Sequence, residues 1–146
     1  MRRADDLLDT VARRLARQQQ RLTTGRTGVV QALAASDRPL TLPEILAARP
    51  DLAQSSAYRN LVVLEQAGVV RRIVTGDEFA RYELAEDLTG HHHHLVCTSC
   101  GRIEDLPASD GIERSVAAAA ALAARRRGFR TAHHRLDLVG TCADCA

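Results

Sequence analysis

The four cysteines of this chain form two pairs, and two residues separate the members of each pair. Cys97 and Cys100 make the first pair, and Cys142 and Cys145 make the second. Four thiolates complete the tetrahedral coordination of a zinc ion and leave no open position. A thiol–disulfide redox pair is the alternative, but no thioredoxin-like βαβ pattern surrounds either pair. The spacing therefore predicts a structural zinc site.

Four consecutive histidines, His91, His92, His93 and His94, stand directly before the first cysteine pair. Four thiolates complete the coordination of a structural zinc ion, so that ion does not need these histidines as ligands. Imidazole binds zinc, iron, copper and nickel. The run therefore predicts a second metal site that senses an ion. A solvated surface or a purification tag is the alternative, and the internal position argues against a tag.

The composition predicts an ordinary folded protein of the cytoplasm. The chain has 146 residues, of which 45% are hydrophobic. No apolar run approaches the roughly 20 residues that a membrane span needs. In a reducing cytoplasm, paired cysteines hold metal more often than they form disulfides. Aromatic residues make up 3% of the chain, which disfavours binding of single strands by base stacking.

The formal net charge of +2 conceals a basic stretch, because no acidic residue occurs between Asp9 and Asp37. The arginines of this stretch are Arg13, Arg14, Arg17, Arg21 and Arg26. Such a stretch suits contact with nucleic-acid phosphates, although a solvated basic helix face is the alternative.

Three helices are predicted before residue 50. Apolar residues recur at helical spacing over residues 8–15 and again over 29–33. Thr41 and Glu44 form a capping box that begins a third helix, and Pro50 ends it.

A fourth helix is predicted from an N-cap at Ser55 or Ser56 to Gly68, which suits a left-handed C-terminal residue. Ser56, Arg59 and Asn60 share its polar face. These side chains are of the types that hydrogen-bond base edges and phosphates, although a merely solvated face is the alternative.

A two-stranded hairpin is predicted next, with strands over 69–74 and 79–84 and a turn over 75–78. Helices followed by such a hairpin are the layout of a winged helix, which reads duplex DNA with its last helix.

The rest of the chain holds all the cysteines and histidines, so we place a hinge at residues 88–90 and predict two domains, 1–88 and 89–146. Strands are predicted over 94–96 and 102–106, and a helix over 112–127 that Gly128 ends. A strand over 132–138 follows, in which His134 points inward.

Motifs along nearly the whole chain, in order, resemble the ferric uptake regulator family of metal-dependent repressors. They are Ser55 to Leu61, Gln66 to Val70, His91 to Gly101, and His134 to Cys145. The resemblance implies an α+β fold, with an N-terminal winged helix-turn-helix domain and a C-terminal α/β dimerisation domain.

The resemblance also implies ligand sets beyond the cysteines. A sensing site maps onto Glu83, His92, His94 and Asp105. An additional site maps onto His91, His93, Glu113 and His134. Alternate residues of a strand face opposite sides, which agrees with this division of the histidines. The donors suit zinc or iron foremost, and also manganese or nickel.

The chain departs from the family at three ligand positions. Iron- and peroxide-sensing members take a histidine from the DNA-binding domain, where this chain has Pro39. Zinc-sensing members use an aspartate and a cysteine, where this chain has Arg71 and Ala85. Neither sub-family is matched.

We therefore expect a homodimeric, metal-responsive repressor, and not an enzyme, that binds palindromic operator DNA with a divalent ion as corepressor. The residues expected on DNA are Arg21, Arg26, Ser55, Ser56, Tyr58, Arg59, Asn60, Arg71 and Arg72. The alternatives are a structural-zinc regulator without metal sensing and, more remotely, a zinc hydrolase that uses the histidine cluster with Glu113 or Glu83.

Overall fold

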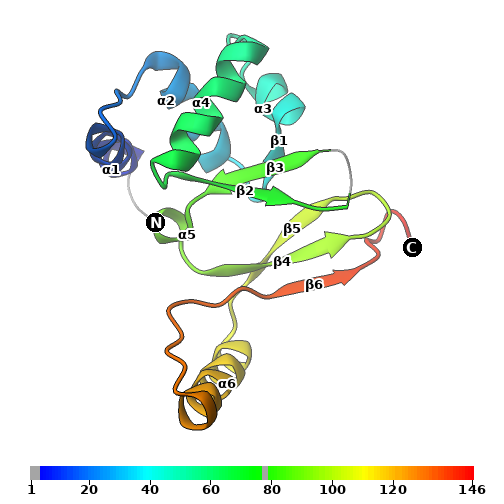
Figure 1. Cartoon of the computed structure of the whole chain (residues 1–146). Helices are drawn as coiled ribbons and strands as arrows, with labels where there is room; N and C mark the ends of the chain where they lie inside the picture. The colour runs from blue at the N-terminus through cyan, green and yellow to red at the C-terminus, as the bar shows by residue number, and fades with distance from the viewer. Residues whose placement is uncertain (1–3, 77–78) are drawn as a thin grey trace.

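Four helices and a small antiparallel sheet make up what we call the winged part of the molecule. The computed structural model describes residues 4–76 and 79–146 (Figure 1). The helices of the winged part are α1 (Ala4–Arg17), α2 (Thr24–Ala34), α3 (Leu42–Ala48) and α4 (Gln54–Gln66). Its strands are β1 (Leu40–Thr41), β2 (Val70–Val74) and β3 (Ala80–Leu84), in the order β1-β3-β2.

Local signals account for most of these helix boundaries. The Thr41 hydroxyl accepts from the Glu44 N–H, and the Glu44 carboxylate accepts from the Thr41 N–H, so the predicted capping box is confirmed. The predicted N-cap of α4 is wrong. Ala53 holds that position without a side-chain cap, and both Ser55 and Ser56 lie inside the first turn.

The hairpin of β2 and β3 confirms the predicted wing. The two strands pair antiparallel from Val70↔Leu84 to Val74↔Ala80. The predicted turn includes residues 77–78, which lie outside the described residues. Gly68, just after α4, has a φ of 72°, as the predicted helix end requires.

One apolar core holds the winged part together. Its fully buried side chains include Leu15, Ile45, Leu61 and Leu64, and its last member along the chain is Leu88. Burial of such side chains is the main stabilising contribution to folding. The segments that follow residue 88 contribute nothing to this cluster among the described residues.

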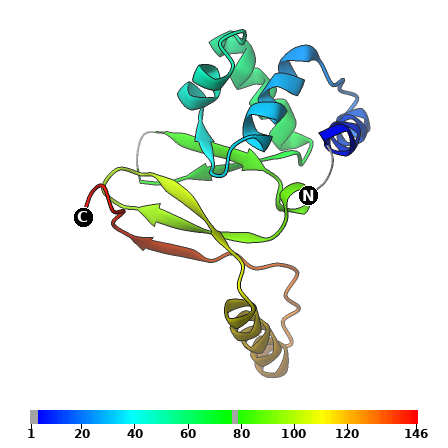
Figure 2. The same cartoon turned by 180° about the vertical axis from the view of Figure 1, so that it is seen from behind.

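A second sheet follows the winged part through the short helix α5 (Glu86–Thr89). Its strands are β4 (His92–Cys97), β5 (Ile103–Pro107) and β6 (Asp137–Gly140), in the order β5-β4-β6. β4 pairs antiparallel with β5 and parallel with β6. Figures 1 and 2 show this sheet lying beneath the wing.

The helix α6 (Asp110–Arg127) begins two residues before the predicted start, because the Ser109 hydroxyl caps it by accepting from the Ile112 N–H. Gly128 ends it at a φ of 61°, as predicted. The strand predicted over 132–138 is confirmed only at its end, because β6 begins at Asp137. The chain returns from α6 without regular structure up to Leu136, whose carbonyl oxygen accepts from the His94 N–H, and Asp137 then pairs with His94.

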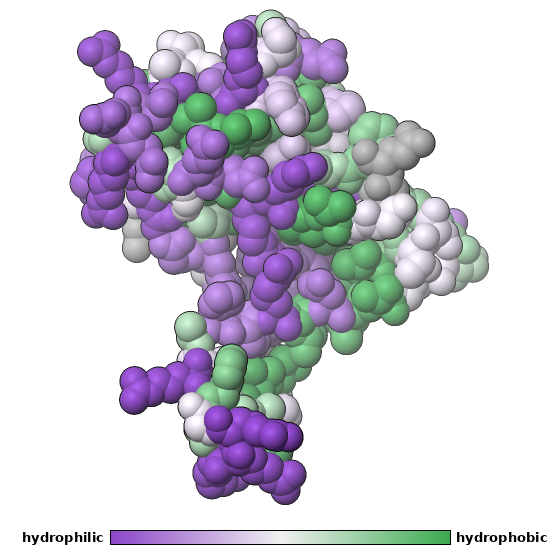
Figure 3. All heavy atoms as spheres, viewed as in Figure 1, coloured by the Kyte–Doolittle hydropathy of each residue, from purple (hydrophilic) through white to green (hydrophobic). Residues whose placement is uncertain are grey.

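α6 projects away from the second sheet (Figures 1 and 2). All residues of α6 are described by the structure, and none of them is buried. Apolar side chains also remain on the outside of β6, where Leu138 is 53% and Val139 is 66% exposed. Figure 3 shows this apolar surface between the second sheet and α6. None of the helices in the described ranges has the length and apolar character required to span a bilayer.

Candidate metal centres

The four cysteines come together at the end of β4. β4 and β6 run in parallel with Cys97 opposite Gly140, so the two Cys-x-x-Cys turns lie side by side. The four sulfur atoms lie within 4.8 Å of one another, and Cys100 Sγ is 3.8 Å from Cys142 Sγ. Zn–S bonds of about 2.3 Å at tetrahedral angles separate two sulfurs by about 3.8 Å. The donor set therefore fits a zinc ion.

Hydrogen bonds to sulfur favour the thiolate form in this cysteine cluster. The Cys142 N–H donates to Cys97 Sγ at 3.3 Å and helps to lower the pKa of the Cys97 thiol to about 6. A thiolate is the form that binds metal. The Thr98 N–H and hydroxyl both donate to the Gly140 carbonyl, which ties the two turns together.

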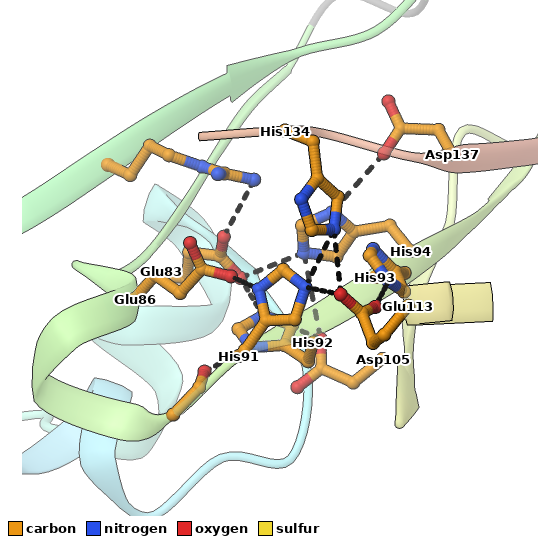
Figure 4. A network of polar contacts seen from close by, with 12 residues as sticks. Glu83, Glu86, His91, His92, His93, His94, Asp105, Glu113, His134 and Asp137 are labelled. Carbon is orange, nitrogen blue, oxygen red and sulfur yellow. Dashed lines mark hydrogen bonds and ion pairs between the residues drawn. The ribbon is translucent and has the colours of Figure 1, made fainter. Parts of the chain in front are cut away.

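A second cluster joins three strands of the molecule. Glu83 comes from β3 of the wing, His92 and His94 from β4, and Asp105 from β5 (Figure 4). Glu83 Oε2 lies 3.1 Å from His92 Nε2 and 3.0 Å from His94 Nε2. Asp105 Oδ1 lies 3.8 and 3.9 Å from the same two nitrogens. Metal bonds of about 2.0–2.2 Å place such donors roughly 3.3–3.6 Å apart, so this set also fits one ion.

Mutual neutralisation compensates for the burial of these charges. Burial alone would raise the pKa of Glu83, but hydrogen bonds from His92 and His94 outweigh it and lower that pKa to about 2. The bond with Glu83 raises the pKa of His92 to about 9. Burial raises the pKa of Asp105. In the absence of metal, a protonated His92 therefore takes the place of the cation.

Metal affinity at this cluster is expected to rise with pH. An ion needs the neutral His92 imidazole, whereas the metal-free site keeps the proton up to about pH 9. Binding then releases a proton, and affinity gains roughly tenfold per pH unit below that value. Titration of Mn²⁺ between pH 6.5 and 8, followed by electron paramagnetic resonance, measures this slope in a His134→Ala protein that weakens the other histidine cluster. The same slope in His92→Gln would contradict the assignment.

Further contacts orient these ligands. His94 Nδ1 lies 3.4 Å from Asp137 Oδ1, and His92 Nδ1 lies 3.0 Å from the Gly90 carbonyl oxygen. Each contact leaves Nε2 directed at the cluster, as outer partners of metal-bound histidines do. Glu83 Oε1 is 3.1 Å from a guanidinium nitrogen of Arg71. The sequence did not reveal Asp137 or the pairing of Arg71, because both depend on strand register.

A third cluster lies on the opposite face of β4. Glu113 Oε1 is 2.7 Å from His93 Nε2, and Glu113 Oε2 is 3.2 Å from His91 Nε2 and 3.1 Å from His134 Nε2. His91 Nδ1 also contacts Glu86 of α5. The hydrogen bond between His93 and Glu113 lowers the pKa of the Glu113 carboxyl group. Three imidazoles and a carboxylate within 4.8 Å again fit one divalent ion, and they tie α6 to the sheet.

The side chains expected on DNA are placed unequally. Ser55, Tyr58 and Arg59 are exposed on α4, and Arg59 forms no ion pair with the described residues. Ser56 and Asn60 are half-buried, and a Cβ at Gly25 would come within 2.9 Å of Asn60 Nδ2, so Asn60 packs against α2.

The arginines expected on phosphates also differ from one another. Arg21 and Arg72 are exposed, and Arg26 donates to the Arg21 carbonyl oxygen. Arg71 is held by Glu83.

The second cluster opens into a cleft that it shares with the winged part. The loop after α2 forms the opposite wall, where Asp37 lies beside Arg38, while Pro39 is buried. This cleft also explains why the charge of Asp37 contributes to raising the pKa of Asp105. The second cluster therefore contacts the winged part through Glu83 and also borders this cleft, which residues of the winged part line.

Comparisons with known proteins agree with this architecture. Residues 17–139 match the family model described as the Ferric uptake regulator family. The chain is 31% identical over 132 residues to the peroxide operon regulator of Bacillus subtilis (strain 168), covering 86% of this chain and 84% of that protein.

Solved structures share the fold. The Helicobacter pylori ferric uptake regulator superposes with a TM-score of 0.78 at 23% identity, over 99% of this chain and 94% of that chain. The Pseudomonas aeruginosa ferric uptake regulator with manganese has a TM-score of 0.68 at 25% identity, over 88% and 95% of the two chains.

Proposed function

The chain belongs to the ferric uptake regulator family, and from this membership we propose how its three clusters serve a metal-responsive transcriptional repressor. The α+β fold supplies the two halves that such a repressor needs, a winged helix for DNA and an α/β part for dimerisation. Members of this family are transcription regulators and not enzymes. We place the boundary between the two domains, 1–88 and 89–146, at the end of the apolar core after Leu88.

One observation carries the sensing mechanism. The second cluster takes Glu83 from the wing, whereas His92, His94 and Asp105 come from the second sheet. A divalent ion there would hold the two parts in one relative position. Because the ion binds that arrangement most tightly, it would shift the population toward the DNA-competent state. The Glu83 carboxylate is thus the link through which the ion acts on the wing.

The donor sets determine which metals we assign. The four thiolates of Cys97, Cys100, Cys142 and Cys145 would hold a structural zinc ion. The second cluster would hold a sensed divalent ion, zinc or iron foremost, with manganese or nickel also suited to nitrogen and oxygen donors. The third cluster would take an additional ion of the same class.

The family's members are dimers, and we propose that this chain pairs through the exposed faces of α6 and β6. Leu122 is 41% exposed on α6, and Leu138 and Val139 are exposed on β6, although all three are apolar. A two-fold dimer presents two copies of α4, so we propose a palindromic operator in double-stranded DNA. We also propose a cytoplasmic location, which zinc-binding cysteines and a DNA partner support.

Arg59→Ala is expected to weaken operator binding by roughly 10- to 100-fold at fixed salt, because an exposed arginine of α4 would lose its contacts to base edges or phosphates. Fluorescence anisotropy with metal-loaded protein measures the affinity, and the same titration should give two chains per palindromic duplex. Arg130→Ala, in the exposed segment between α6 and β6, is the matched control. Unchanged affinity of Arg59→Ala would contradict the assignment of α4 as the recognition helix.

A further inference from the structure

Arg71 contacts the sensing carboxylate from the side away from the histidines. It lies on β2 directly opposite Glu83 of β3 in the register of the wing. A guanidinium nitrogen of Arg71 is 3.1 Å from Glu83 Oε1, whereas Glu83 Oε2 faces both His92 and His94. The two oxygens of one carboxylate therefore serve two different cation positions. One position already holds a permanent positive charge.

This pair is shielded from water. The Glu83 side chain is 11% exposed, and that of Arg71 is 31% exposed. Arg71 Nε is buried and has no hydrogen-bond partner among the described residues. The ion pair with Glu83 is the one that Arg71 forms within those residues. Solvent therefore screens an ion at the histidines from Arg71 only in part.

We propose that Arg71 is a resident cation that shares Glu83 with the sensed metal ion, opposes the binding of that ion by charge repulsion and thereby sets the metal concentration at which the protein responds. The inference rests on the proposed function in one respect, namely that Glu83, His92 and His94 hold the sensed ion. It assigns Arg71 to the control of metal affinity and not to a phosphate of the operator. It also makes Glu83 a ligand through one oxygen, since the other stays with Arg71.

The sign of the effect separates charge repulsion from simple positioning. An ion bound to Glu83 Oε2 would lie about 5 Å from the guanidinium, given usual metal–oxygen distances. At that separation the repulsion between a dication and a guanidinium corresponds to roughly a tenfold loss of affinity, even with strong screening. Removal of the charge should therefore tighten metal binding. If Arg71 served mainly to aim Glu83, its removal would weaken metal binding instead.

Mn²⁺ titration of the zinc-loaded protein tests the proposal, with the free ion followed by electron paramagnetic resonance. All proteins carry His134→Ala, which removes a ligand from the third cluster. Arg71→Gln keeps an N–H donor for Glu83 but removes the charge, Arg71→Lys keeps the charge, and Arg125→Gln removes a charge far away on α6. Zinc content and circular dichroism confirm that each variant is folded.

We expect the Kd for Mn²⁺ to fall about tenfold in Arg71→Gln and to stay near the parental value in Arg71→Lys and Arg125→Gln. An unchanged or raised Kd in Arg71→Gln would overturn the proposal, and so would a tenfold fall in Arg71→Lys.

Operator binding measured on the same samples distinguishes a failure of the proposed function from a failure of the proposed role of Arg71. If Mn²⁺ binds but operator affinity does not respond to it, the proposed function fails while the titration still decides the role of Arg71. If Arg71→Gln changes only operator affinity, with a shallower salt dependence, Arg71 is a phosphate contact and the inference fails.

Discussion

Cys97→Ser is expected to release the zinc ion and to lower the unfolding midpoint by more than about 10 °C, because structural zinc contributes several kcal/mol or more to folding. Cys97 ends β4 and is 4% exposed, so its thiolate joins the central strand of the second sheet to the turn after β6. The apolar core of the winged part does not extend past Leu88. We therefore expect the zinc site to contribute much of the stability of the second sheet, alongside the buried side chain of Ile103.

Zinc content by atomic emission and thermal unfolding by circular dichroism measure this effect. Ser99→Ala is the matched control, because Ser99 lies exposed in the same turn without belonging to the thiolate set. It should keep one zinc ion per chain at this site and an unchanged midpoint. A Cys97→Ser protein with full zinc content and normal stability would contradict the four-thiolate assignment.

Glu83→Gln is expected to abolish metal-dependent operator binding, with a loss of 100-fold or more in the effect of the ion. Changes in the outer partners of metal ligands already cost about 10- to 100-fold in affinity, and Glu83 would be a direct ligand. It is also the member of the second cluster that comes from the wing. The substitution keeps the shape of the side chain while it removes the charge that faces His92 and His94.

Anisotropy titrations of operator DNA with and without added metal measure the loss. Glu104→Gln on β5 is the control, because it removes a carboxylate beside Arg102 and outside the three clusters. It should respond to metal as the parental protein does. Normal metal-dependent binding by Glu83→Gln would instead favour a regulator whose zinc is structural and whose control lies elsewhere.

The structure also explains why the departures from the family's ligand positions need not disable the second cluster. Pro39 is buried and offers no donor, and Arg71 is a cation. Four donors nevertheless converge without them, namely one oxygen each from Glu83 and Asp105 and the Nε2 atoms of His92 and His94. The direct link to the winged part is therefore Glu83 of β3. The cleft beside the cluster is also lined by Asp37 of the winged part.

Local sequence signals determined much of the fold. The capping box at Thr41, the glycine after α4 and Gly128 after α6 act through neighbouring backbone atoms, so a short window of sequence is sufficient to predict them. Local reasoning failed at the beginning of α4. The serines at 55 and 56 are good caps, but the chain enters α4 earlier, at Gln54.

Most of the strand predicted over 132–138 is absent, for a different reason, since β6 begins at Asp137. Alternating residues can pair only where a partner strand is in reach, and β4 offers its edge to this segment from His94 onward. His134 nevertheless reaches Glu113 from a stretch without regular structure. Its inward position was predicted correctly, although the element was not.

The two cysteine pairs and the alternation of four histidines can be read without a structure, since ligand spacing and the two-residue period of a strand are local properties. The carboxylates were assigned through the family resemblance, and they meet the histidines only in the folded protein, because β3, β5 and α6 approach β4 from distant parts of the chain. The same holds for Arg71. Its sequence context suggests a phosphate contact, but the cross-strand register of the wing places it on Glu83, where charge and burial give it a different role.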